Sequence, residues 1–259
     1  MRKNFKYIYG PVPSWRLGSS LGIDLLSTSE KACSFDCIYC QLGPTRAYTT
    51  KRKLYVPTRD VLKEIKMLPR VRIDYITFSG CGEPTLAINL GQAIRVVKRL
   101  RKEPVAVLTN SSLLYRKDVR RELALADMVA VKLDADSEKF LKAMNRPAKK
   151  IKFSAILKGI KHFREEYRGK LALQVMLTRE NKAIARNIAR LAEFICPDEV
   201  QISTPVRPCA VKPLPRKNIL ALKKHFRGLS TITLYTVRRK KVRPVSAKDT
   251  MLRRGKTLE

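Results

Sequence analysis

The sequence predicts an α/β fold: a parallel sheet with crossover helices that closes into a partial (β/α)6 TIM-like barrel. Short apolar segments alternate with segments of helical period, which is the pattern of parallel strands joined by helices. The chain has 259 residues, and a full barrel of eight units needs about 250. Because roughly forty-five residues at the two ends do not read as βα units, six units are expected instead of eight.

The first two expected strands enclose the first helix. Residues 20–26 (SLGIDLL) form a strand that leads into a loop with three cysteines. Residues 59–68 have helical period, and Thr58 is the expected N-cap because it follows Pro57 and precedes the periodic segment. Residues 73–78 (IDYITF) form the second strand, which a Ser-Gly-Cys-Gly run ends.

The remaining elements follow in the same alternation. After a helical segment at 86–100, strands are expected at 105–108, 128–133, 171–177, 199–202 and 232–237, and helices at 117–126, 137–144, 154–167, 181–195 and 216–225. Residues 1–237 are predicted to form one core domain and residues 238–259 a basic C-terminal tail. The tail has nine basic and two acidic residues, and both a mobile arm and a segment packed on the barrel are consistent with it.

The composition points to a polyanionic partner. Lys and Arg number 55 and Asp and Glu 22, which gives a net charge of +33. Such a charge attracts nucleic acid, and RNA is the expected partner. A high-temperature surface is the alternative, but it would supply acidic residues together with the basic ones. No apolar run of about 18 residues and no secretory signal are found, so no membrane association is expected. Six cysteines are too few for a disulfide scaffold, so a reducing cytoplasm is the expected location.

Three cysteines within eight residues form the strongest motif. Cys33, Cys37 and Cys40 follow the pattern CxxxCxxC. A [4Fe–4S] cluster normally takes four cysteines, so three would leave one iron open to another ligand. A structural zinc site is the alternative, but it usually has four ligands. Here no second cysteine pair follows, and the two histidines are His162 and His225.

Further motifs stand at the ends of the next two expected strands. The sequence SGCGEPT begins at Ser79, after the second strand, and TNSS begins at Thr109, after the third. Ligands bind at the carboxyl ends of strands in parallel α/β folds. The motif positions and the predicted fold therefore support each other.

Together these motifs resemble those of the radical S-adenosylmethionine (SAM) enzymes. CxxxCxxC with an aromatic residue before its last cysteine, followed by a Gly-Glu-Pro turn, is similar to their signature. The runs YGPVPS from Tyr9, CIYCQLG from Cys37, VKLDA from Val131 and TPVRP from Thr204 resemble the subgroup related to wyosine-tRNA synthesis.

This resemblance implies a [4Fe–4S] cluster and SAM as cofactors. Cys33, Cys37 and Cys40 would bind three irons, and the amine and carboxylate of SAM would bind the fourth. One electron, from a reductase or a flavodoxin- or ferredoxin-type donor, would cleave SAM to methionine and a 5′-deoxyadenosyl radical. The radical would then remove hydrogen from a substrate.

The resemblance also implies contacts with SAM. Tyr39 is expected against the adenine, although packing of the loop is an alternative role. The turn residues Gly80, Gly82, Glu83 and Pro84 are expected to meet the methionine amine. Asn110 and Ser111 are expected at the ribose or the carboxylate, and Gln201 near the adenine. Lys132 and Asp134 share a face of one strand, and they are expected either to contact the ligand or to form ion pairs with neighbours.

Three cysteines lie outside the motif. Cys196 is expected to be a small buried residue, whereas Cys81 and Cys209 lie on loops that could face the substrate. The expected function is modification of RNA, with a tRNA base as substrate. One alternative is an activase that installs a glycyl radical on a protein. Another is a non-catalytic, metal-containing module that binds nucleic acid. The sequence predicts no oligomeric state.

Overall fold

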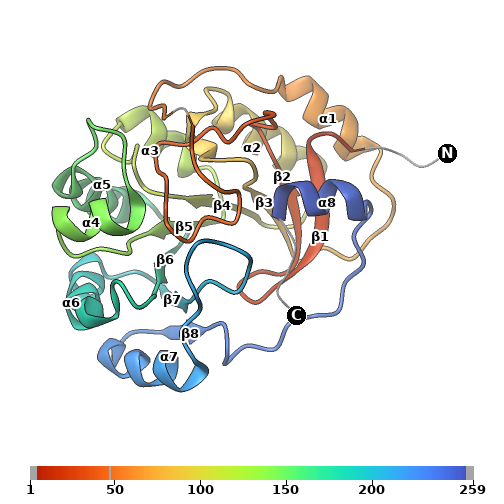
Figure 1. Cartoon of the computed structure of the whole chain (residues 1–259). Helices are drawn as coiled ribbons and strands as arrows, with labels where there is room; N and C mark the ends of the chain where they lie inside the picture. Colours follow the sequence, from red (N-terminus) through yellow and green to blue (C-terminus); the bar gives the residue numbers. More distant parts are fainter. Residues whose placement is uncertain (1–4, 47, 255–259) are drawn as a thin grey trace.

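A computed structural model describes residues 5–46 and 48–254 of the chain. Eight strands form one sheet in the order β1-β2-β3-β4-β5-β6-β7-β8. Strand β1 is antiparallel to β2, and every later neighbour pair is parallel. The sheet curls into a partial barrel with helices on its outer side (Figure 1). The predicted fold class is therefore confirmed.

The strands have the following bounds: β1 Ile8–Ser14, β2 Gly18–Ile23, β3 Tyr75–Phe78, β4 Val105–Thr109, β5 Met128–Lys132, β6 Lys170–Met176, β7 Glu199–Ser203 and β8 Thr231–Thr233. The helices are α1 Thr58–Lys66, α2 Leu90–Leu100, α3 Lys117–Leu123, α4 Glu138–Asn145, α5 Phe153–Glu166, α6 Ala185–Ile195, α7 Arg216–Lys223 and α8 Ala247–Arg254. Short 3-10 helices are η1 Pro84–Leu86, η2 Lys182–Ile184 and η3 Lys224–Phe226. Strands β2 to β7 are each followed by helix, which gives the six predicted units.

The central strands have apolar side chains on both faces. In β4, β5 and β6, alternate residues belong to two different apolar clusters, as the two-residue period of a strand requires. The larger cluster contains Val105, Val107 and Val129 and joins the sheet to the outer helices. The smaller cluster lies on the opposite, concave face and consists of Leu17, Ala106, Met128, Ala130 and Ala172. Because parallel strands buried on both faces need such continuous apolar runs, the sequence pattern specifies this sheet.

Strand β1 was not predicted. It contains Pro11 and Pro13, and proline cannot donate a ladder hydrogen bond. The strand is tolerated because it lies at the edge of the sheet, where β2 is its one neighbouring strand, and its register shifts between Tyr9 and Val12. The prolines explain why the segment does not resemble a strand in the sequence.

Three further expectations are corrected. Pro57, not Thr58, occupies the N-cap of α1, and the Thr58 hydroxyl instead bonds to the side chains of Gln92 and Asn89. Helix α2 begins at Leu90 instead of residue 86, because the 3-10 helix η1 occupies the preceding segment. Strand β8 ends at Thr233, where a turn closed by the Thr236 N–H and the Thr233 carbonyl begins.

The described part of the basic tail packs on the barrel. The Val245 N–H donates to the Gly10 carbonyl at 2.7 Å, and the Gly10 N–H donates to the Thr250 hydroxyl at 2.9 Å. Helix α8 therefore covers strand β1 (Figure 1). The last five residues of the predicted tail, 255–259, lie outside the described residues, and the domain boundary at residue 237 stays a prediction. Within residues 5–46 and 48–254, no helix combines the length and the apolarity needed to cross a membrane.

Candidate active site

The loop with the three cysteines is fixed by the segment that ends helix α4. The Ile38 N–H donates to the Met144 carbonyl at 3.0 Å, and the Asp36 N–H donates to the Asn145 carbonyl at 2.9 Å. The Ala148 N–H donates to the Ser34 carbonyl at 2.9 Å. These backbone bonds hold the loop against the carboxyl ends of the strands.

The cysteine sulfurs have nitrogen donors close to them. Cys33 Sγ accepts from the Phe35 N–H at 3.4 Å and lies 3.6 Å from the Asn110 amide nitrogen. Cys37 Sγ accepts from the Asn145 amide at 3.4 Å. Burial raises the pKa of the Cys33 thiol to about 12 and that of the Cys37 thiol to about 11. Metal coordination would reverse this preference, because a bound metal deprotonates a thiol outright.

The chemistry of this donor set, three cysteines and no fourth, fits a [4Fe–4S] cluster that leaves one iron open. Among the residues that the structure describes, no three His, Cys, Asp or Glu side chains are arranged to hold one metal ion. A [4Fe–4S] cluster distributes its cysteines over different irons, so the thiolates need not converge on one point. Hydrogen bonds to the sulfurs are a usual means of tuning such clusters.

The Gly80–Gly82 turn meets the cysteine loop directly. The Ala32 N–H donates to the Cys81 carbonyl at 3.1 Å, and the Glu83 N–H donates to the Ala32 carbonyl at 3.0 Å. Gly82 has a φ of 151°, and a β-carbon there would lie 1.7 Å from the Ala32 carbonyl oxygen. Only glycine allows this close approach, so the predicted turn and the residue before Cys33 form one unit.

Glu83 and Pro84 support this turn from within. The Glu83 carboxylate is buried and accepts hydrogen bonds from the Thr85 N–H and hydroxyl, the Thr109 hydroxyl and the Asn110 N–H. Pro84, which is also buried, begins η1. Burial raises the pKa of Glu83, and the four donors oppose that shift. The carboxylate thereby ties the turn after β3 to the end of β4.

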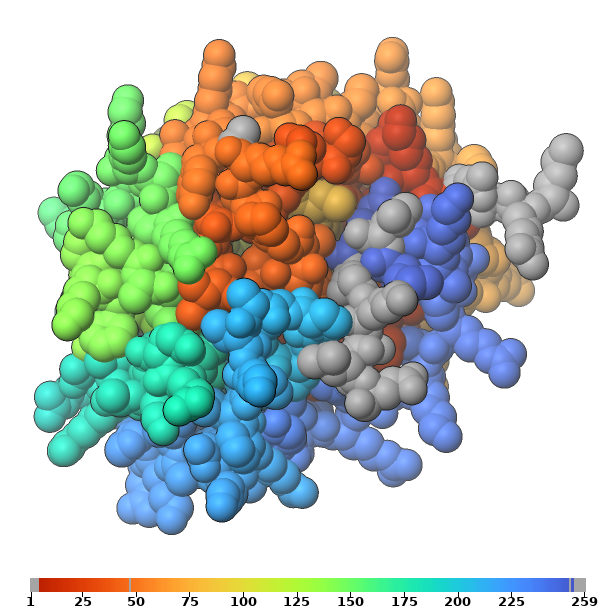
Figure 2. All heavy atoms as spheres, in the orientation of Figure 1, coloured from red at the N-terminus to blue at the C-terminus, as the bar shows by residue number. Residues whose placement is uncertain are grey.

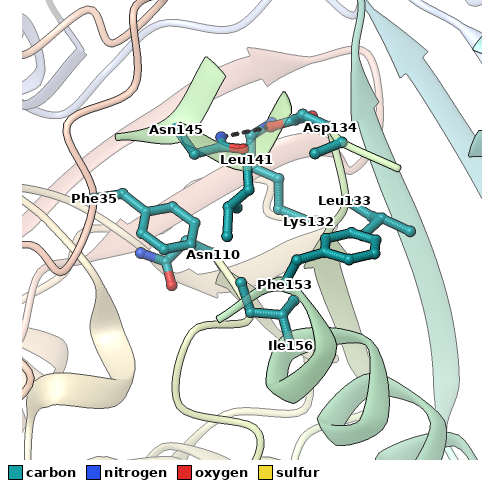
Figure 3. A pocket seen from close by; sticks show the side chains of 10 residues that line it. Phe35, Asn110, Lys132, Leu133, Asp134, Leu141, Asn145, Phe153 and Ile156 are labelled. Carbon is teal, nitrogen blue, oxygen red and sulfur yellow. Dashed lines mark hydrogen bonds and ion pairs between the residues drawn. The ribbon is translucent and has the colours of Figure 1, made fainter. Parts of the chain in front are cut away.

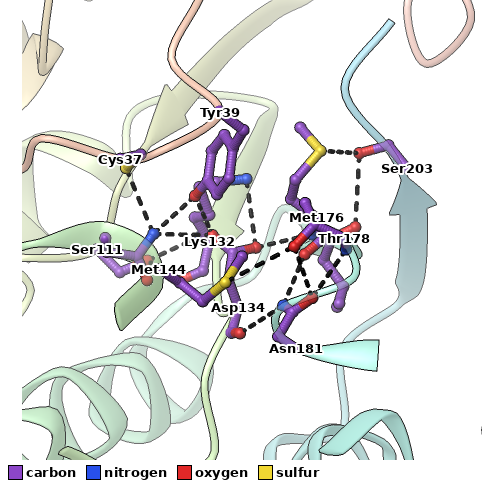
Figure 4. A network of polar contacts seen from close by, with 12 residues as sticks. Cys37, Tyr39, Ser111, Lys132, Asp134, Met144, Met176, Thr178, Asn181 and Ser203 are labelled. Carbon is purple, nitrogen blue, oxygen red and sulfur yellow. Dashed lines mark hydrogen bonds and ion pairs between the residues drawn. The ribbon is translucent and has the colours of Figure 1, made fainter. Parts of the chain in front are cut away.

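A buried polar network joins the cysteine loop to β5 and β6 (Figure 4). The Tyr39 hydroxyl donates to Asp134 Oδ2, and the Asn145 amide donates to the Tyr39 oxygen at 2.6 Å and to Asp134 at 3.0 Å. Asp134 Oδ1 accepts from the Met176 N–H at 2.7 Å. Lys132 Nζ lies 3.4 Å from Asp134 and 4.9 Å from the centre of the Tyr39 ring. Burial, followed by the charge of Asp134, raises the pKa of Tyr39.

The other three residues that are expected to contact SAM lie in three different environments. Asn110 is half-buried beside Cys33 and Ser34. Ser111 is fully buried, and its hydroxyl bonds to the backbone of Lys132 at 2.9 and 3.0 Å, so it joins β4 to β5. Gln201 is buried within β7, and its amide donates to Glu199 at 2.8 Å. No described residue forms a hydrogen bond with Gln201 Oε1, and none of the contacts described joins Gln201 to the Tyr39 network.

A small cavity lies beneath this network (Figure 3). Its lining includes Phe35, Asn110, Lys132, Asp134 and Asn145. Its volume is about 10 Å³, which is roughly the room for one water molecule. The cavity is therefore far too small for a ligand of the size of SAM.

Sequence reasoning missed two residues of this region. Asn145 ends α4 and contacts Cys37, Tyr39 and Asp134. Asp24 follows β2, is buried, and accepts from the Cys81 N–H at 3.1 Å. The signal for Asp24 was present, because it is an acidic residue at the carboxyl end of a strand. Asn145 carried no such signal, since its role depends on where α4 ends in space.

The three cysteines outside the motif have separate environments. Cys196 is exposed at the end of α6, so the expectation that it is buried was wrong. It ends the helix in the left-handed conformation and its thiol donates to the Glu193 carbonyl, a position that faces solvent. Cys81 lies in the turn beside Asp24, and the Cys209 thiol donates to the Val211 carbonyl at 3.2 Å.

Comparisons with known proteins agree with this arrangement. The family model "Radical SAM superfamily" matches residues 31–192. The chain is 42% identical over 218 residues to the UPF0026 protein slr1464 of Synechocystis. The aligned region covers 84% of this chain and 81% of that protein.

Solved structures show the same fold. SuiB of Streptococcus suis bound to S-adenosylmethionine has a TM-score of 0.62 at 15% identity, over 79% of this chain and 48% of that chain. An archaeal TYW1 has a TM-score of 0.58 at 16% identity, over 82% of this chain and 72% of that chain. The chain thus spans about half the length of SuiB. Radical SAM enzymes use a [4Fe–4S] cluster and SAM, and this chain belongs to the radical SAM superfamily.

Proposed function

We propose that this radical SAM enzyme binds its cluster through Cys33, Cys37 and Cys40 and modifies RNA, with a tRNA base as its substrate. The observation that carries the cofactor assignment is the direct contact between the cysteine loop and the Gly80–Gly82 turn through Ala32. Bound there and reduced by one electron from an external donor protein, the cluster and SAM would supply radical chemistry for the removal of a hydrogen atom from the substrate.

The chain's own residues orient and shield this chemistry. Backbone carbonyls of the glycine turn are suited to accept hydrogen bonds from the ammonium of SAM. The Tyr39–Asp134–Asn145 network keeps the loop between Cys37 and Cys40 in place. Cys33 and Phe35 belong to the main apolar core, so one side of the site excludes water, which protects reactive species from side reactions.

Support for RNA comes from the charge around the cysteine loop. The loops that follow β2, β6 and β7, together with the loop between α4 and α5, carry exposed basic residues: Arg46, Lys51, Lys149, Lys150, Arg179 and Lys212. Figure 2 shows the orange, green and light-blue segments that contain most of them on one face of the molecule. A basic rim would hold phosphates around a base that is turned into the site.

The resemblance of several motifs to enzymes of wyosine-tRNA synthesis also supports tRNA. Binding to such a substrate is electrostatic to a large extent, so the affinity must fall as salt rises. The test measures the affinity of the reconstituted enzyme for total tRNA at several salt concentrations, and SAM cleavage with and without tRNA. A steep salt dependence and faster cleavage with tRNA support the proposal.

A matched pair of variants distinguishes tRNA contact at these rim residues from a general attraction by the net positive charge of the protein. Lys149→Ala with Lys150→Ala removes two rim cations. Arg238→Ala with Arg239→Ala removes two cations from a groove that Ser19 and Arg72 also line, at the amino ends of the strands. The rim variant should lower the slope of log affinity against log salt by about 2, because roughly one counterion is released per phosphate contact. Equal losses in both variants would reject the rim as the contact surface.

The activase alternative predicts a different partner. A pull-down that recovers a protein with a modified glycine, together with SAM cleavage that tRNA leaves unchanged, would favour it. A protein that binds tRNA but forms no 5′-deoxyadenosine would favour the non-catalytic module.

A further inference from the structure

We infer that Asp24 and Arg253 form a buried ion pair that positions the Gly80–Gly82 turn for SAM, so that the C-terminal helix α8 is a working part of the cofactor site. The inference rests on the proposed assignment of that turn to SAM. Asp24 and Arg253 are positioning residues, because they act through the backbone of the turn.

Asp24 lies directly under the turn. It is 1% exposed, and its Oδ1 accepts from the N–H groups of Leu26 and Ser27, each at 3.0 Å. Its Oδ2 accepts from the Cys81 N–H at 3.1 Å. A β-carbon on Gly80 would lie 2.2 Å from Asp24 Cγ, so the carboxyl group fills the space that a side chain at position 80 would take.

Arg253 brings the opposite charge from the far end of the chain. It is 7% exposed, and its Nε lies 3.5 Å from Asp24 Oδ2. Its other nitrogens donate to the Lys6 carbonyl, to the Ser27 hydroxyl at 3.1 Å and to the Asp249 carbonyl at 3.1 Å. No described residue accepts a hydrogen bond from Nε, so the group facing Asp24 acts through its charge.

The same helix also reaches the cysteine loop. The Gln41 amide, one residue after Cys40, lies 3.5 Å from the Arg253 carbonyl. Helix α8 thus reaches the cysteine loop through Gln41 and the glycine turn through Asp24. In Figure 1 it lies across β1, near the carboxyl end of β2.

The pairing has an energetic consequence. A buried carboxylate that loses its partner is strongly unfavourable, because its charge is then uncompensated in a low-dielectric site. Loss of Arg253 is therefore expected to let Asp24 move towards water and release the Cys81 N–H. The turn would lose a defined position, while the part of the cysteine loop that the Met144 and Asn145 carbonyls hold at Ile38 and Asp36 would keep its own.

The test compares Arg253→Gln and Arg253→Lys with Lys248→Gln, which removes an exposed cation from the same helix. Three quantities are measured: iron bound after reconstitution, the dissociation constant for SAM, and amide hydrogen exchange at Cys81 in the protein before reconstitution. Arg253→Gln should bind normal iron, weaken SAM roughly tenfold or more, and speed exchange at Cys81, as loss of a buried partner implies. Arg253→Lys should retain part of the SAM affinity and part of the protection of the Cys81 amide from exchange. Lys248→Gln should behave as the wild type.

A double-substitution cycle separates positioning from loss of folding. Asp24→Asn keeps the shape of the side chain and removes the charge, so adding Arg253→Gln to it should weaken SAM little further. Wild-type SAM affinity in Arg253→Gln would overturn this inference but leave the proposed function untouched. A loss of SAM affinity that runs parallel to the loss of melting temperature across the variants would also overturn it. If the wild-type holoenzyme does not bind SAM at all, the proposed function fails with it.

Discussion

Gly82 and Ala32 lie so close together that a β-carbon on Gly82 would fall 1.7 Å from the Ala32 carbonyl oxygen. This contact joins the glycine turn after β3 to the residue before Cys33. Because the clash is with backbone, a flexible side chain cannot move to relieve it, and the turn or the cysteine loop must shift.

Gly82→Ala should therefore weaken SAM binding by at least about tenfold, since the two halves of the site can no longer meet. Gly228→Ala is the matched control: Gly228 has a φ of 82°, but nothing lies within 4 Å of its β-carbon position. That variant should lose only about 1–2 kcal/mol of stability from backbone strain. Titration of SAM and urea denaturation measure the two effects, and normal SAM affinity in Gly82→Ala would contradict the account.

Each motif cysteine should be required for the cluster. Cys33→Ala, Cys37→Ala and Cys40→Ala are expected to reduce iron and sulfide to background after anaerobic reconstitution, because three thiolates are the minimum set for such a centre with one open iron. Cys196→Ala, at an exposed position, should bind iron as the wild type does. Full iron content in any of the first three variants would remove that residue from the ligand set.

Asn145→Leu should destabilise the protein. The substitution removes the amide that donates to Cys37, Tyr39 and Asp134, and leucine has no polar atom to take its place in this buried network. The expected loss is about 1–3 kcal/mol in urea denaturation. Asn187 also donates to a carboxylate, that of Asp136, but at an exposed position. Asn187→Leu should thus change stability by less than about 0.5 kcal/mol, and similar losses in both variants would contradict the prediction.

Stability should fall at acid pH partly through Asp118. A hydrogen bond from Arg116 lowers the pKa of Asp118 from 3.8 to about 2. A group whose pKa is lower in the folded state stabilises the protein above its unfolded pKa and loses that contribution as the pH falls through the folded value. The contribution of Asp118 should therefore disappear between about pH 4 and pH 2. Asp118→Asn should flatten this part of a plot of urea midpoint against pH; an unchanged slope would show that the pair contributes nothing there.

Much of the barrel could be predicted because its strands carry a local signal. The segments of β4, β5 and β6 are apolar on both faces, and the intervening helices have a clear period. Strand β1 carries the opposite signal, since Pro11 and Pro13 are unfavourable in strands. It forms because a strand at the edge of a sheet can contain residues without an N–H. Which strand lies at the edge becomes known only from the assembled sheet.

The site shows the same division. The cysteine and glycine motifs could be found because short spacings encode them. Asn145 and Arg253 could not, since each acts where its helix ends relative to distant loops. Arg253 lies in a basic tail whose sequence is equally consistent with a mobile arm. Its burial and its contact with Asp24 distinguish it from the exposed cations around it.

Reductive cleavage of SAM tests the central claim most directly. The reconstituted protein is given dithionite and SAM under anaerobic conditions, and 5′-deoxyadenosine is quantified beside the Cys37→Ala variant. The account predicts 5′-deoxyadenosine from the wild type and only background from the variant. No 5′-deoxyadenosine from a wild-type protein that holds a full complement of iron and sulfide would contradict it.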